Sequence, residues 1–110
     1  MQTHSHVISV LNQGLVLDVA LGELGFTAYV VVSEPDISRV ADLVPQEHYD
    51  RHGDLHVTAI EAADEAHEQI IELAFHMNQG DAAVFLCRDE PAYMAALHEL
   101  GQQIPSVSHN

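Results

Sequence analysis

The stretch that decides the predicted fold runs from Leu55 to Gly101 and reads LHVTAIEAADEAHEQIIELAFHMNQGDAAVFLCRDEPAYMAALHELG. Two apolar runs, Leu55–Ile60 and Ala82–Cys87, have the length and composition of β-strands. Each run is followed by a segment with apolar residues at helical spacing, first Ala63–Asn78 and then Pro91–Leu100. This order predicts a strand-helix-strand-helix cassette.

The joints of this cassette carry residues that start and stop helices. Asp64 and Asp89 stand where N-caps are expected, because their short carboxylates can accept hydrogen bonds from free helical N–H groups. Gly80 and Gly101 follow the two helical segments, and glycine commonly ends a helix in a left-handed conformation. We therefore expect each helix to begin at an acid and end at a glycine.

The first half of the chain predicts a similar order. His6–Leu11 is rich in β-branched residues and predicts a strand. Apolar residues at helical spacing within Leu17–Leu24 predict a helix that ends at Gly25. Thr27–Val32 is apolar nearly throughout and predicts a central parallel strand, and Ser33 caps a helix that runs to Val44.

A second interpretation of the first half uses a hairpin. In it, Asn12–Gly14 forms a turn between His6–Leu11 and a strand over Leu15–Ala20, since Leu15–Leu17 is itself typical of a strand. We favour the helix over this hairpin.

Together these elements predict one α/β domain over residues 1–110, with a small, open, mainly parallel four-stranded sheet and helices. Residues 6–44 and 55–101 form the two halves of a possible tandem βαβα repeat, and residues 102–110 form a flexible tail. Alternatively, the resemblance of the halves reflects only the common use of the same caps and stops in α/β chains. Leu55–Ile60 alternates apolar and polar residues, which favours an edge strand.

The charge of the chain is strongly negative. It has 17 acids and 3 basic residues, all Arg, which gives a formal charge of −14. Such a chain repels a phosphate backbone, so direct binding to nucleic acid is disfavoured. We expect instead a basic protein partner, although net charge also serves solubility. Protonation of all nine His residues reduces the formal charge to −5, so charge-driven association is expected to depend on pH.

Several other sequence features bound the class of protein. No apolar run approaches the roughly 20 residues that a membrane span needs, and the first six residues contain no Lys or Arg that would mark a signal peptide. We therefore expect a cytoplasmic protein. The single Cys87 lies within an apolar run and is interpreted as a buried core residue rather than a catalytic thiol. A homodimer is expected because small sheets often cover an edge with a second copy.

One polar stretch is a candidate metal site. His48, His52 and His56 recur every four residues, and their imidazoles can bind Zn²⁺ or Ni²⁺, with Asp54 as a further ligand. Gly53 interrupts the helical geometry that would place His48 and His52 on one face. A solvated His-rich loop is the alternative interpretation.

A second candidate site is an acidic rim at the carboxyl ends of the predicted strands, where open parallel sheets bind ligands. Carboxylates there could hold Mg²⁺, but the chain has no glycine-rich phosphate loop and no Lys. Helix capping accounts for the same acids. The rim comprises Glu34, Asp36, Glu61, Asp64, Asp89 and Glu90.

These observations favour a non-enzymatic acidic protein-binding or regulatory module. In the most specific form of this hypothesis, the module is an inhibitor, or a mimic of nucleic-acid charge, that acts on a basic partner. The alternatives are a His-based divalent metal-binding protein and a small ligand-sensing or Mg²⁺-dependent domain.

Overall fold

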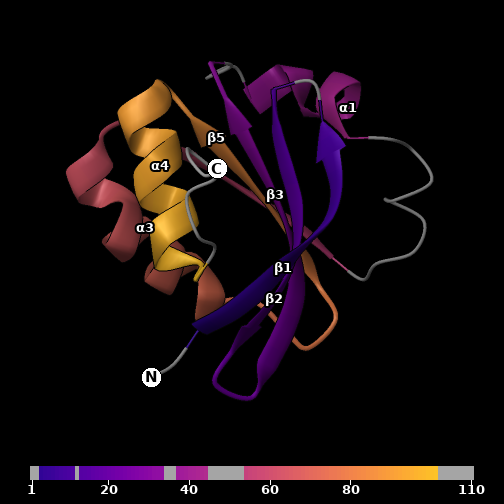
Figure 1. Ribbon diagram of the computed structural model, residues 1–110. Coiled ribbons are helices and arrows are strands. Elements are labelled where there is room, and N and C mark those ends of the chain that lie inside the picture. Colours follow the sequence, from indigo (N-terminus) through magenta and orange to yellow (C-terminus); the bar gives the residue numbers. More distant parts are fainter. Residues whose placement is uncertain (1–2, 12, 34–36, 45–53, 102–110) are drawn as a thin grey trace, which may run out of the picture.

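A computed structural model describes residues 3–11, 13–33, 37–44 and 54–101 (Figure 1). Five strands, three α-helices and two short 3₁₀ helices form along this part of the chain. In chain order they are β1 (Thr3–Leu11), β2 (Gly14–Leu21), β3 (Leu24–Val32), η1 (Ile37–Arg39), α1 (Val40–Leu43), β4 (Leu55–Ile60), η2 (Ala63–Glu65), α3 (Ala66–Ala74), β5 (Ala82–Cys87) and α4 (Glu90–Glu99).

The strands form one mixed sheet in the order β1-β2-β3-β5-β4. β1, β2 and β3 are antiparallel neighbours, whereas β5 runs parallel to both β3 and β4. The prediction of a mainly parallel four-stranded sheet is therefore wrong, and so is the tandem βαβα repeat. The first half supplies an antiparallel meander, and only the second half is the predicted strand-helix-strand-helix cassette.

The error lies in β2, which was predicted as a helix. β2 is a strand with large apolar side chains on both faces: Leu17 packs into the core beneath α3 and α4, and Val16 packs into the core on the opposite face. Burial alternates from Leu17 to Leu21, with Asp18 and Ala20 exposed, but apolar residues occur on both faces, so the sequence does not show this alternation clearly. Leu17, Ala20, Leu21 and Leu24 therefore also fall at helical spacing. Gly25 does not end a helix but lies within β3.

The hairpin that joins β1 to β2 depends on Gly14. Gly14 pairs with Val31 of β3, and a Cβ added to Gly14 would lie 1.7 Å from the carbonyl oxygen of Val30. No side chain fits in that space, so the position requires glycine. The following turn, from β2 to β3, uses Gly22 with φ of 63°, a left-handed conformation that glycine adopts at little cost.

The cassette from β4 to α4 is confirmed in its order and in most of its bounds. β4 and β5 have the predicted bounds, β5 is buried at every residue, and β4 is an edge strand as expected. β3 is central, as expected for its apolar sequence. Asp89 caps α4, because its carboxylate accepts a hydrogen bond from the N–H of Ala92 at 3.0 Å.

Two predicted caps are wrong. The η2–α3 segment begins without a side-chain cap, so Asp64 does not serve as one. Ser33 has φ of 69° and donates its backbone N–H to the Cys87 carbonyl at 2.9 Å, which extends the β3–β5 pairing instead of starting a helix. The helix predicted after Ser33 is reduced to η1 and α1, and α3 ends at Ala74 rather than Asn78.

Two cores lie on opposite faces of the sheet. α3 and α4 cover one face, where Leu17, Ala28 and Phe85 are buried. On the other face Tyr29, Val84 and Leu86 pack with Val40 and Val44, at α1 and the residue that follows it. Figure 1 shows α3 and α4 together on one side of the sheet and α1 on the other. Within the described part of the chain, no helix has the length and apolar character needed to cross a membrane.

Candidate metal centre

The candidate site lies where the parallel strands β4 and β5 begin. Asp54 directly precedes β4, His56 is its second residue, and Asp81 directly precedes β5. The register pairs Leu55 with Ala82, so the chain segments that enter the two strands lie side by side. Three side chains with metal-ligating atoms are therefore brought together from two strand starts.

Asp81 is the buried member of this group, with a residue exposure of 5%. Its Oδ2 lies 2.9 Å from His56 Nε2 and also accepts a hydrogen bond from the Asn78 N–H at 2.9 Å. Its Oδ1 accepts one from the Asp54 N–H at 3.2 Å. A buried carboxylate is costly unless it is hydrogen-bonded, and these contacts meet that requirement.

The same hydrogen bonds lower the pKa of Asp81 from its ordinary value of 3.8. The N–H of Asn78 has the largest effect, followed by the hydrogen bond with His56; burial opposes them, and the Asp54 N–H adds a smaller lowering effect. Hydrogen bonds to the charged form favour it, so Asp81 is a carboxylate at neutral pH. The buried acid therefore has the charge state that a metal ligand needs.

Backbone hydrogen bonds hold the site against β3 as well. The Asp81 carbonyl accepts a bond from the Thr27 N–H at 3.2 Å, and the Ala82 N–H donates to the Asp54 carbonyl at 3.0 Å. Nearby, Gly80 donates its N–H to the Gly25 carbonyl at 2.8 Å. The segment before β5 thus ties together the starts of β3, β4 and β5, which fixes the position of the Asp81 carboxylate.

Asp54 completes the group with an exposed carboxylate. Ligand atoms of Asp54, His56 and Asp81 all lie within 4.8 Å of one another, and no other group of three such side chains among the described residues meets this distance. Two carboxylates this close repel each other unless a positive charge lies between or beside them. A bound cation would supply such a charge.

The distances fit a divalent ion with a small rearrangement. Zn²⁺ binds His nitrogen and carboxylate oxygen at about 2.1 Å, so two tetrahedral neighbours lie about 3.4 Å apart. The separation of 2.9 Å between His56 Nε2 and Asp81 Oδ2 is about half an ångström shorter. In the ion-free arrangement a proton occupies the space between these two atoms, and the metal would replace that proton.

The structure brings together only part of the predicted His cluster. His56 and Asp54 belong to the group, whereas His48 and His52 lie outside the described residues. Asp81 was missed, although an acid that directly precedes a continuously apolar strand was visible in the sequence. Its partner Asp54 is 27 residues away, and only the pairing of β4 with β5 connects them.

The acidic rim lies at the opposite ends of these strands. There Glu61 Oε1 accepts a bond from Arg88 Nη1 at 3.1 Å, and Asp89 caps α4. Asp64 and Glu90 are exposed, and Glu34 and Asp36 lie outside the described residues. Two of the predicted rim acids therefore already have structural partners.

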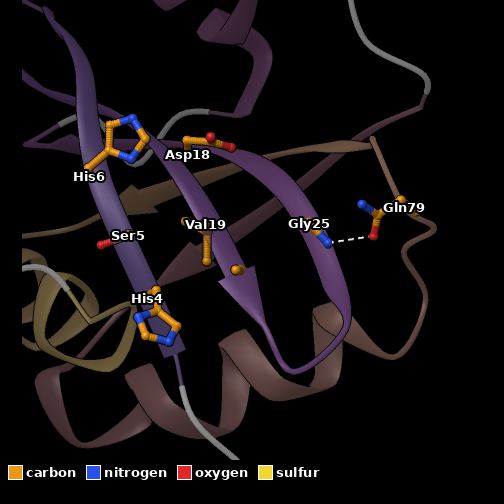
Figure 2. A pocket seen from close by; sticks show the side chains of 8 residues that line it. His4, Ser5, His6, Asp18, Val19, Gly25 and Gln79 are labelled. Atoms are coloured by element: carbon orange, nitrogen blue, oxygen red, sulfur yellow. Dashed lines mark hydrogen bonds between the residues drawn. The ribbon is translucent and has the colours of Figure 1, made fainter.

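A separate hollow of about 380 Å³ lies over β1 and β2 (Figure 2). His4 and His6, which lie two residues apart on β1 and so face the same side of the sheet, both line it, and His6 pairs in register with Asp18 of β2. Figure 2 shows the two imidazoles at separate ends of the hollow. Gln79 and Gly25 line the hollow on the side of β3, and the Oε1 of Gln79 accepts a hydrogen bond from the Gly25 N–H at 2.6 Å.

No protein-family model matches this sequence, and the searches of curated proteins and of solved structures found no significant match.

Proposed function

We propose that this protein binds a divalent transition-metal ion, in the first instance Zn²⁺, through Asp54, His56 and Asp81. The observation that carries the proposal is the convergence of three ligand atoms within 4.8 Å, from residues that enter two neighbouring strands. Asp81 and His56 alone would suffice as a structural hydrogen bond. A structural hydrogen bond between His56 and Asp81 does not need a second carboxylate beside it. A bound cation does, because the negative charge of Asp54 helps to balance the charge of the ion.

The donor set favours particular ions. One imidazole and two carboxylates suit Zn²⁺, Mn²⁺ or Ni²⁺, whereas Mg²⁺ prefers an all-oxygen shell and retains its waters. The three protein ligands leave a fourth position for water or for a donor from another molecule. We propose a binding role rather than catalysis. The only thiol of the chain, Cys87, is fully buried, and burial raises its pKa to about 12, which leaves it without nucleophilic character.

Calorimetric titration with Zn²⁺, Ni²⁺ and Mg²⁺ tests this proposal. Zn²⁺ should bind with one site per chain and more tightly than Mg²⁺. Repeating the titration at several pH values should show weaker binding at acid pH, because metal ligands must be deprotonated. Tight binding that does not change on acidification would place the ion elsewhere.

Variants locate the ion. Asp54→Asn and His56→Ala should each weaken Zn²⁺ affinity by about 100-fold or more, since each removes a direct ligand and even residues that only orient a ligand are worth about 10-fold to 100-fold. His67→Ala is the matched control: His67 also pairs with an acid, Glu99 Oε1 at 2.7 Å, but lies outside the group. Equal affinity in all three variants would refute the site and leave the His56–Asp81 pair as a structural contact.

A second candidate function follows from the exposed acids of η2 and α3. Glu65, Glu68 and Glu72 are exposed and recur at intervals of three and four residues, so they share one helical face. We propose this face as the surface that attracts a basic protein partner, the acidic binding or regulatory role expected from the sequence. A formal charge of −14 supports it, because long-range attraction increases encounter rates with cationic partners.

Binding of a Lys-rich peptide at low and high salt tests this second role. Glu65, Glu68 and Glu72 changed together to Gln should lower the affinity strongly at low salt. The control changes Asp18 and Asp42 to Asn and Glu23 to Gln, three other exposed acids, and so removes the same charge. Equal loss in both triple variants would show that net charge alone, and not this face, attracts the peptide.

A further inference from the structure

The edge strand β1 concentrates the exposed apolar side chains of the molecule. Four large hydrophobic residues of the described chain are exposed: Val7 at 38%, Ile8 at 48%, Val10 at 74% and Phe75 at 81%. Three of these four belong to β1. β1 pairs with β2 on one side, and among the described residues no strand pairs with its other side. At the start of β1, a Cβ added to Gly101 would lie 2.6 Å from the Thr3 carbonyl oxygen, so another part of the chain lies close to this end of the strand. Farther along, from Val7 to Leu11, the backbone groups on the side away from β2 point outward, toward the place of a further strand.

This edge is also the uncharged part of a highly charged chain. The first 17 residues contain no Asp, Glu, Lys or Arg, although the whole chain contains 17 acids and 3 bases. Two copies that each carry −14 repel each other wherever their acids meet. A basic partner has no carboxylate to bind on β1. The neutral, apolar edge is instead suited to a partner that shares the charge of this chain.

We infer that β1 is the surface through which two copies of this chain form a homodimer, with β1 paired to β1 of the partner copy. Antiparallel pairing of identical strands is compatible with a two-fold axis and closes after two copies. The sheet then continues through both subunits, and Val7, Ile8 and Val10 lose much of their exposure. The inference is independent of the proposed metal centre, whose residues lie at the opposite edge of the sheet.

The other edge strand, β4, is less suited to this role. The Thr58 hydroxyl of β4 donates to Gln69 Oε1 of α3 at 3.3 Å, so α3 already contacts this strand. Acids lie beside it as well, with Asp54 exposed at its start and Glu72 lining a small hollow along it. A second copy at β4 would therefore meet carboxylates, which it does not meet at β1.

The register shift between Val7 and Ser9 limits which part of β1 pairs. Val7 faces Leu17 of β2, whereas Ser9 faces Val16, so Ile8 is an extra residue that bends the strand. Such bulges restrict pairing to the regular segments on either side and disfavour extended stacking of many copies. A closed dimer rather than an open fibre is the expected product.

Light scattering after size exclusion, from micromolar to near-millimolar chain concentration, tests the inference. The protein should have twice the 12.1 kDa chain mass. Val10→Lys should raise the dimer dissociation constant by about 100-fold or more, because it buries unpaired ammonium groups at the interface. Phe75→Lys is the matched control, since it places the same charge at an equally exposed apolar site on another surface.

Hydrogen exchange provides a readout that needs no variant. The amides of Val7–Leu11 in β1 that point away from β2 should become more protected as concentration rises, in step with the mass. A single-chain mass throughout the concentration range would overturn the inference, and so would a dimer that survives Val10→Lys. Protection of β1 that does not depend on concentration in a single-chain particle would assign the edge to another part of the same chain, which also overturns it.

Discussion

His56 Nε2 lies 2.9 Å from Asp81 Oδ2, across the starts of two parallel strands that are hydrogen-bonded neighbours. The side chain of His56 is 19% exposed and that of Asp81 is 7% exposed, so the contact is largely shielded from water. Shielding strengthens a charge-assisted hydrogen bond and makes its loss more costly. The pair therefore contributes to the stability of the ion-free protein.

Asp81→Asn should destabilise the protein by about 2 kcal/mol or more. The Asn side chain has an NH2 group in place of one carboxylate oxygen, so a buried backbone N–H that bonded to that oxygen loses its acceptor. The carboxylate accepts hydrogen bonds from two backbone N–H groups, those of Asn78 and Asp54, besides its contact with His56. Urea unfolding measures the change. Asp54→Asn is the control and should change the free energy of unfolding little, because its side chain is exposed and its backbone N–H is retained. Equal effects of the two substitutions would contradict this account.

The stability that Asp81 provides should depend on pH in a defined direction. Its folded pKa is lowered from 3.8, so its contribution is present above pH 3.8 and is lost as pH falls through the folded pKa. The difference in unfolding free energy between the native protein and Asp81→Asn should therefore shrink as the pH falls below about 4. Denaturant titrations at a series of pH values measure it. A difference that grows on acidification would show that the carboxylate is not stabilised in the folded protein.

The parts of the fold that were predicted correctly are those whose local signals are unambiguous. β5 is buried on both faces and bounded by Gly80 and Asp81 before it and by charged residues after it, so its run of apolar residues has clear ends. β2 has an exposed acid and an exposed alanine, Asp18 and Ala20, among its apolar residues, and this pattern also fits the helical spacing from which a helix was predicted. The close approach of Gly14 to Val30 of β3 is a contact between neighbouring strands, so it distinguishes a strand from a helix here. The sequence alone does not show this contact.

The candidate site was half predicted for a related reason. His56 and Asp54 are two residues apart and were both considered as ligands from their spacing. Asp81 joins them only because β5 pairs with β4 in a register that sets Leu55 opposite Ala82. Strand order and register depend on how the whole sheet packs, so a contact across 27 residues could not be read from local patterns.

Asp89→Ala should destabilise the protein by about 1 kcal/mol, the usual cost of losing a helix N-cap. The substitution leaves the Ala92 N–H without the carboxylate that now accepts its hydrogen bond at 3.0 Å. Asp64→Ala is a matched control in the first turn of the η2–α3 segment, where no side-chain cap forms, and should have little effect. Thermal unfolding of both variants measures the difference. A larger loss for Asp64→Ala would indicate that the caps had been assigned to the wrong acid.

Cys87 should react with thiol reagents only after the protein unfolds. It is fully buried, and burial raises its pKa from 9.0 to about 12, with a smaller contribution from the charge of Asp89. At pH 8 this shift alone reduces the thiolate fraction by about 1000-fold. Labelling followed by mass spectrometry should therefore be slow in buffer and fast in urea. Rapid labelling of the folded protein would mean that the core beneath α4 opens readily.

Gly14→Ala should be among the most damaging single substitutions in the sheet. The new Cβ would lie 1.7 Å from the Val30 carbonyl oxygen and 2.9 Å from Val31 Cα, so the β2–β3 ladder would have to separate there. We expect a loss of about 3 kcal/mol or more, measured by urea unfolding. Gly80→Ala is the control: Gly80 has φ of 88° and no atom within 4 Å of an added Cβ, so only backbone strain of about 1 kcal/mol is expected. A larger loss for Gly80→Ala would contradict this account, because it would show that backbone strain costs more stability than the close approach of β2 to β3.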